Sequence, residues 1–251
     1  MGFLEKIIVT PSHHRVHHAI NKEYIDKNYG QIFIFWDKLF GTYQEELTAV
    51  PPVYGITRPV RTWNPIKINF QHLWLMMKDA WHTNNWKDKL FLWFKPTGYR
   101  PADVAERFPV YKIDDPYQFE KYDTKTSPAM NAWSWTQLFM ILLFTSYLFG
   151  KIAFINSLDP YFIYWYGAFI FLSVYAITEL MDRNPNALFW EGLKMIMAGW
   201  FLYRQGDWFG ASAMLPSIKY IVPIYFIASL MVTAYFVYKF KREDAVLRVN
   251  A

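Results

Sequence analysis

Three stretches in the second half of the chain are almost continuously apolar. Each contains 20 or more residues, roughly the length that an α-helix needs to cross the ~30 Å hydrocarbon core of a bilayer. They are residues 133–155, 161–181 and 218–238. The pattern predicts that each of these stretches is a transmembrane helix.

A fourth stretch, residues 187–203, is apolar but contains Glu191 and Lys194. These residues are three positions apart, so they share a helix face and can form an ion pair that lets the segment enter a bilayer. We therefore expect about four transmembrane helices within residues 131–243. Basic residues are typical of cytoplasmic loops, so the positive residues at 239–242 predict a cytoplasmic C-terminus.

The first half of the chain has shorter hydrophobic runs. Thr10 and Pro11 are typical of an N-cap and a first helical turn, and they predict a helix that extends to about Asn21. The mostly apolar stretch 29–42 ends near Gly41 and predicts a buried or interfacial helix. The segment with the histidines therefore precedes the membrane part.

Residues 51–130 are predicted to form an interfacial amphipathic helix and proline-rich connections. Stretch 70–94 has helical periodicity and places tryptophans among lysines and aspartates, a composition typical of a membrane interface. Stretches 44–66 and 95–130 contain four and five prolines, which predict an extended connection and a loop.

The composition supports a membrane protein, because 53% of the 251 residues are hydrophobic and 21% are aromatic. The net charge of +5 comes from dispersed lysines and arginines, which suit an anionic lipid surface better than nucleic acid. Cysteine is absent, so any metal must be held by histidine, aspartate or glutamate. Together with the patterns above, this predicts an all-α integral membrane protein.

Four histidines lie within six residues of the predicted N-terminal helix. His14, His17 and His18 have the i, i+3 and i+4 spacing that places side chains on one helix face. Neutral imidazole is a good ligand for iron or zinc, so these three residues are candidate metal ligands. His13 is offset by about 100° and is a weaker candidate. Asp37 is a candidate to orient a ligand imidazole through a hydrogen bond.

The sequence around these histidines resembles the third histidine box of the fatty acid hydroxylase and sterol desaturase superfamily. The segments that carry the resemblance are residues 10–21, 24–30 and 36–42, with weaker matches at 53–59, 63–65, 94–100, 182–185 and 202–204. Within the superfamily, the chain is most similar to the branch that oxidises alkylglycerol ether lipids. Residues 1–50 then correspond to the C-terminal part of the catalytic domain.

The resemblance implies a fold, an activity and a set of ligands. It maps the HxxHH ligands of the family onto His14, His17 and His18 and implies a di-iron centre that hydroxylates a lipid C–H bond with O2. It also implies tetrahydrobiopterin as the electron donor. The membrane is expected to be a bacterial inner membrane or the endoplasmic reticulum, with the histidine box on its cytoplasmic side.

The superfamily has two earlier histidine boxes, which this chain lacks. Its other histidines, His72 and His82, are ten residues apart and are more typical of an amphipathic helix than of a metal site. A di-iron centre needs about six or more protein ligands. We therefore expect the chain to be the C-terminal portion of a longer enzyme, inactive without its N-terminal segment. The alternatives are a sterol desaturase or fatty acid hydroxylase of the same superfamily, or a truncated non-catalytic membrane protein.

Overall fold

The computed structural model describes residues 2–96 and 98–249, and every helix or strand element within this range is a helix. Residues 1–61 and 72–122 form one compact unit, and residues 62–71 and 123–251 form a second. The predicted all-α class is confirmed.

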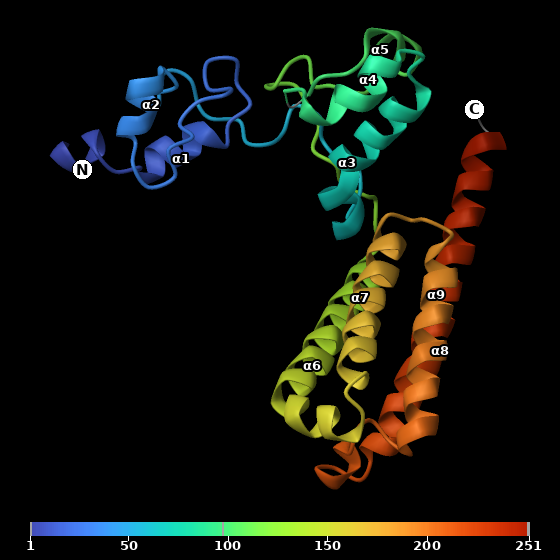
Figure 1. The fold of residues 1–251 in the computed structure, drawn as a ribbon. Helices are drawn as coiled ribbons and strands as arrows, with labels where there is room; N and C mark the ends of the chain where they lie inside the picture. Colours follow the sequence, from blue (N-terminus) through green and yellow to red (C-terminus); the bar gives the residue numbers. More distant parts are fainter. Residues whose placement is uncertain (1, 97, 250–251) are drawn as a thin grey trace. The chain divides into compact units, whose positions relative to one another are not determined.

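The first unit contains short helices joined by ordered loops (Figure 1). Its elements are η1 (Gly2–Lys6), α1 (Pro11–His17), α2 (Phe35–Phe40), α4 (Trp86–Phe91), η2 (Leu92–Phe94) and α5 (Ala102–Arg107). Helix α3 (Pro65–His82) begins in the second unit and continues into the first. A small apolar core is formed by Val16, Ala19 and Tyr24, against which Val50 packs. The Tyr24 hydroxyl donates a hydrogen bond to the carbonyl of Val50 at 2.7 Å. This core fixes the C-terminal end of the histidine-bearing helix.

Several predicted element boundaries were wrong. The helix predicted from Pro11 to Asn21 ends at His17, and the Asn21 side chain instead bonds the backbone of Pro51 and Val53. The predicted helix over 29–42 shrinks to α2, because the start of this stretch contains a left-handed residue, Gln31 (φ 46°), which an α-helix cannot include.

The remaining boundaries differ in similar ways. Stretch 70–94 is interrupted after α3, and a new helix starts where the Asn85 side chain accepts a hydrogen bond from the backbone N–H of Lys87. The region predicted as a loop at 95–130 contains the short helix α5. Local polar caps, which hydrophobic periodicity does not detect, set these boundaries.

The second unit is a bundle of long helices that run alongside one another (Figure 1). They are α6 (Pro128–Leu158), α7 (Phe162–Met181), α8 (Ala187–Gln205) and α9 (Ile218–Val249), with the short helix η3 (Ala211–Ala213) before α9. Aromatic side chains fill the bundle core. The Trp208 indole donates a hydrogen bond to the Tyr166 hydroxyl, which in turn donates to the carbonyl of Phe144. All three of these residues are buried.

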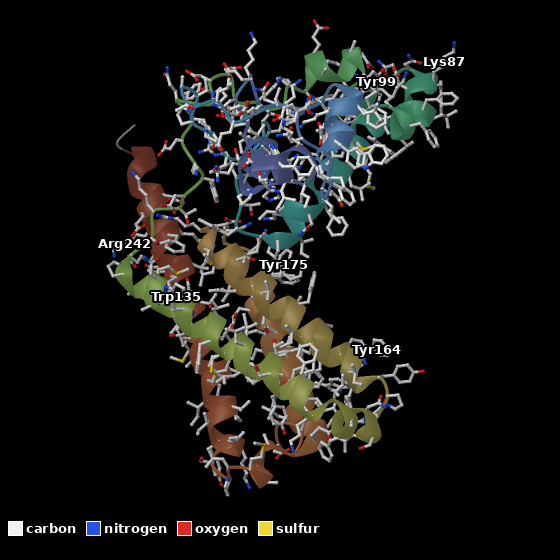
Figure 2. The ribbon with its side chains drawn as sticks, turned by 90° about the vertical axis from the view of Figure 1, so that its left-hand side faces the viewer. Lys87, Tyr99, Trp135, Tyr164, Tyr175 and Arg242 are labelled. Atoms are coloured by element: carbon white, nitrogen blue, oxygen red, sulfur yellow. The ribbon has the colours of Figure 1, made fainter. Side chains whose placement is uncertain are left out.

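Within the described residues, three helices are long and apolar enough to cross a membrane: α6, α7 and α9. Figure 2 shows Trp135 and Tyr175 towards one end of the bundle and Tyr164 towards the other, the positions that aromatic side chains favour at membrane surfaces. Helix α8 packs between α7 and α9 but carries Glu191 and Lys194. A fourth span therefore stays a prediction.

The last turn of α7 is tied to the start of α3 inside the second unit. Glu179 is buried, accepts a hydrogen bond from the Asn64 amide at 2.8 Å and forms an ion pair with Lys67 at 2.5 Å. Asp182 accepts hydrogen bonds from the Thr62 hydroxyl and the backbone N–H of Trp63. The residues that enter α3 are therefore fixed to one end of a candidate membrane span.

Candidate metal-binding histidine cluster

Helix α1 starts as its sequence predicts, and His13 takes part in that start. The backbone N–H of Thr10 donates a hydrogen bond to Nδ1 of His13 at 3.2 Å, and Pro11 occupies the first turn. His13 is buried and its ring packs edge-on against Tyr43. Burial lowers the pKa of His13, which keeps the imidazole neutral and able to accept this bond. His13 therefore caps the helix and lies apart from the other three histidines.

His14, His17 and His18 come together on the exposed side of α1. The ring centroids of His14 and His18 are 4.4 Å apart, those of His17 and His18 are 5.2 Å apart, and those of His14 and His17 are 6.2 Å apart. The Nε2 atoms of His14 and His18 are separated by only 3.1 Å. One of these two atoms carries a proton in this contact, and both would have to be unprotonated to bind a metal.

A backbone carbonyl orients one of these rings. Nδ1 of His17 lies 3.2 Å from the carbonyl oxygen of Lys27, so Nδ1–H donates and the lone pair of Nε2 remains free. A hydrogen bond of this kind is the usual support of a metal-binding histidine. The ring of Tyr29 packs edge-on against His17 at 5.7 Å. The loop after α1 thus sets the orientation of the His17 ring.

Asp37 holds that loop in place. Its buried carboxylate accepts hydrogen bonds from the backbone N–H groups of Tyr29 and Gly30 at 2.7 and 2.8 Å, and from the Thr42 hydroxyl at 2.6 Å. These bonds offset the cost of burying the carboxylate. These three bonds fix the backbone next to Tyr29, whose ring contacts His17, and a role of Asp37 in orienting a ligand imidazole stays a prediction. The sequence pattern does not reveal this arrangement, because two of the three donors are backbone groups.

A shallow cavity of about 550 Å³ lies beside the cluster. Its lining includes His14 and His18 together with Tyr54 and Ile56. An imidazole pair next to an apolar wall can place an alkyl chain close to a metal-binding position. The sequence marked Tyr54 and Ile56 only as part of the weaker match at 53–59 and gave them no role at the cluster. A bridge between Ala19 and Tyr54 brings them next to α1.

An ion pair at the same cavity fixes the first turn of α1. The Arg15 guanidinium donates hydrogen bonds to both carboxylate oxygens of Glu46, and Ser12 donates to the same carboxylate at 2.6 Å. The Arg15 and Ser12 hydrogen bonds lower the pKa of Glu46. The loop at residues 44–50 is therefore attached to the histidine-bearing helix.

The chemistry of the cluster fits a metal that prefers nitrogen ligands. Three imidazoles share one face and one tautomer is set, which suits iron or zinc. In the described part of the chain, no group of three or more histidine, aspartate or glutamate side chains closes around one point as a finished metal site would. His82 bonds the Lys78 carbonyl on α3, well separated in sequence from the cluster.

A helical protein with membrane-length apolar helices and a histidine cluster resembles membrane-bound hydroxylases, and comparison with known proteins supports this class. Residues 1–42 match the profile of the Fatty acid hydroxylase family. This segment contains all four clustered histidines and Asp37.

Most of the chain is also related to alkylglycerol monooxygenases. It is 33% identical to human alkylglycerol monooxygenase over 230 residues, which are 90% of this chain and 49% of that enzyme. It is 29% identical to the Danio rerio enzyme over 235 residues, with 91% and 49% covered. A shorter match to the Caenorhabditis elegans enzyme is 50% identical over 74 residues, which are 30% of this chain and 15% of that enzyme. No solved structure matches the chain.

These findings confirm the resemblance inferred from the sequence. The chain is a relative of alkylglycerol monooxygenases over most of its length, and its first 42 residues carry the fatty acid hydroxylase match. It spans about half the length of the curated relatives that it matches.

Proposed function

We propose that this chain is the C-terminal portion of a membrane-bound, iron-dependent lipid monooxygenase that acts on alkylglycerol ether lipids. The observation that carries the proposal is the convergence of His14, His17 and His18 inside the segment that matches the fatty acid hydroxylases. The names of the relatives support an ether-lipid substrate. The apolar helices α6, α7 and α9 support access to a substrate dissolved in the bilayer.

In this proposal, His14, His17 and His18 bind iron through their Nε2 atoms. When bound, the di-iron centre supplies O2 activation for insertion of oxygen into a lipid C–H bond. The Lys27 carbonyl keeps the proton of His17 on Nδ1, so Nε2 is available to the metal. Tyr54 and Ile56 form the wall against which an alkyl chain lies next to the imidazoles.

Three imidazoles are fewer than the six or so protein ligands that a di-iron centre needs. We propose that the remaining ligands come from an N-terminal segment that is not part of this sequence. The relatives are about twice as long as the matched region, which supports this view. Tetrahydrobiopterin is the proposed electron donor.

The proposed topology places the histidine cluster and the C-terminal end of α9 on the cytoplasmic side. The basic residues Lys239, Lys241 and Arg242 near the end of α9 support it. With an even number of spans between them, both parts face the same side, so the topology requires α8 to cross the bilayer. The membrane is that of a bacterial cell or the endoplasmic reticulum.

The experiment compares iron content and alkylglycerol cleavage for two proteins in native membranes: this chain alone, and the chain with the reading frame upstream of Met1 translated in front of it. We expect turnover and a full iron complement only for the longer protein. Single variants His14→Ala, His17→Ala and His18→Ala of the longer protein should lose bound iron and activity. His72→Ala is the matched control and should retain both.

Three outcomes would contradict parts of the proposal. Two irons and full turnover in the short chain would show that it is complete. An upstream stop codon, with no iron bound, would favour a non-catalytic membrane protein. Hydroxylation of sterols or fatty acids in place of ether-lipid cleavage would keep the metal site and change the substrate.

A further inference from the structure

Helix α3 exposes an apolar face. Leu73, Trp74, Met77 and Trp81 have the spacing that places residues on one side of a helix, and all four are exposed in the first unit. Trp81 has 80% of its surface accessible. A helix of a water-soluble protein turns such a face towards the core, so this orientation needs another explanation.

The opposite side of α3 contains the buried charge. Asp79 is 2% exposed and accepts two hydrogen bonds from the Arg100 guanidinium, at 2.7 and 2.8 Å. Arg100 also donates to the carbonyl of Phe108 at 2.8 Å. This bidentate pair packs the polar side of α3 inwards. The outward direction of the apolar face is therefore fixed by specific interactions.

Helix α4 also exposes apolar side chains. Trp86 and Leu90 are exposed by 73% and 62%, and they are four positions apart on one face. Figure 2 labels Lys87 on this helix and Tyr99 in the loop that follows. We call the residues Leu73, Trp74, Met77, Trp81, Trp86 and Leu90 the α3–α4 aromatic surface.

Lysines accompany the tryptophans of this surface. Nζ of Lys78 lies 5.3 Å from the Trp74 ring centroid, and Nζ of Lys89 lies 5.4 Å from that of Trp86. Tryptophan favours the headgroup region of a bilayer, and lysine favours anionic lipid there. A protein–protein interface is usually depleted in lysine, which makes a protein partner a poorer fit.

The chain enters α3 at the end of a candidate span. Asn64 and Lys67 bind Glu179 in the last turn of α7, and the end of a span lies at the bilayer surface. We propose that the α3–α4 aromatic surface inserts into the headgroup region of the bilayer and that Lys78 and Lys89 bind anionic lipid there.

Site-directed spin labelling can test this insertion, because the natural sequence has no cysteine. The whole chain, with its tryptophans intact, is labelled at Met77→Cys or Leu90→Cys and reconstituted in nanodiscs. Glu106→Cys, at an exposed polar position of α5, is the matched control. Accessibility is measured to O2, which concentrates in lipid, and to a water-soluble nickel chelate. Circular dichroism verifies the helix content of each variant.

We expect the ratio of O2 to nickel accessibility to be several-fold higher at positions 77 and 90 than at position 106. A ratio equal to that of the control would show a water-exposed surface and overturn the proposal. Low accessibility to both reagents would show that protein covers the surface, which would also overturn it. None of these outcomes depends on iron or turnover.

The lysine part of the proposal has its own comparison. Nanodiscs that contain phosphatidylglycerol should raise the ratio at position 77 above its value in phosphatidylcholine alone. The Lys78→Gln/Lys89→Gln chain should lose this increase, whereas Lys112→Gln, at an exposed position of the same unit, should keep it. An equal increase in all three chains would show that these lysines do not bind the headgroups.

Discussion

Replacing Lys194 by methionine should strongly destabilise the helix bundle. Nζ of Lys194 lies 2.6 Å from Glu191 and 3.1 Å from Ser229, and it is 3.4 Å from the Gln137 side-chain oxygen. Lys194 is 1% exposed and Glu191 is 3% exposed. The substitution keeps the length and apolar volume of the side chain but leaves the carboxylate buried without its counter-charge.

The magnitude follows from the kind of interaction that is lost. Breaking a buried ion pair by removing one partner costs about 3–5 kcal/mol, since the remaining charge stays desolvated. An ordinary hydrogen bond between membrane helices contributes only about 0.6 kcal/mol on average. The charge therefore decides the outcome. Converting Glu191 to glutamine as well should recover much of the loss, because the double variant has no uncompensated charge.

The assay is reversible unfolding of the chain in bicelles, with free energies for the wild type, Lys194→Met, Glu191→Gln and the double variant. Lys219→Met is the control, because Lys219 is exposed at the start of α9. We expect a large loss for each single variant of the pair and less than about 1 kcal/mol for the control. Additive losses in the double variant, or a Lys194→Met chain as stable as the control, would refute the coupling of the two charges.

Two further predictions concern the first unit. Gly30→Ala should lower the free energy of unfolding by about 1–3 kcal/mol, because the added Cβ would overlap the Phe33 carbonyl. Gly150→Ala is the control: its Cβ would meet no atom within 4 Å, so the free energy of unfolding should change by less than about 1 kcal/mol. Equal effects of the two changes would contradict this packing. The hydrogen bonds from Arg15 lower the pKa of Glu46 below its ordinary 4.5. The stabilisation from the Arg15–Glu46 ion pair should therefore be complete above pH 4.5 and decrease as acid protonates the carboxylate. Thermal unfolding from pH 7 to 3 should therefore depend less on pH for Glu46→Gln than for the wild type, and identical profiles would show that the pair contributes nothing.

The membrane helices could be predicted closely from the sequence. Continuous apolar stretches predicted 133–155 and 161–181, and the helices are α6 (Pro128–Leu158) and α7 (Phe162–Met181). A long apolar stretch has few alternative structures, since its backbone groups must bond within the segment. Helix α8 (Ala187–Gln205) was also expected as a helix, and its crossing of the bilayer stays a prediction.

The histidine cluster could be predicted in part. The spacing correctly brought His14, His17 and His18 to one face, because three of the four positions follow the helical repeat. It could not show that His13 accepts a hydrogen bond at the helix start, nor that Lys27 orients His17. Both features depend on backbone groups in loops, and such loops have no repeating pattern.

Helix α3 shows a different limit of sequence patterns. Its periodicity identifies an apolar face and a polar face, but the pattern is the same whether the apolar face points inwards or outwards. The direction is set by the pairing of Asp79 with Arg100, two residues 21 positions apart. An inward Asp79 requires an outward Trp81, so one buried ion pair decides which side of the helix is available to lipid. For this reason, Asp79→Asn should lower the ratio of O2 to nickel accessibility of a spin label at position 77. Position 77 lies on the exposed apolar face of α3, whereas Asp79 lies on the buried face.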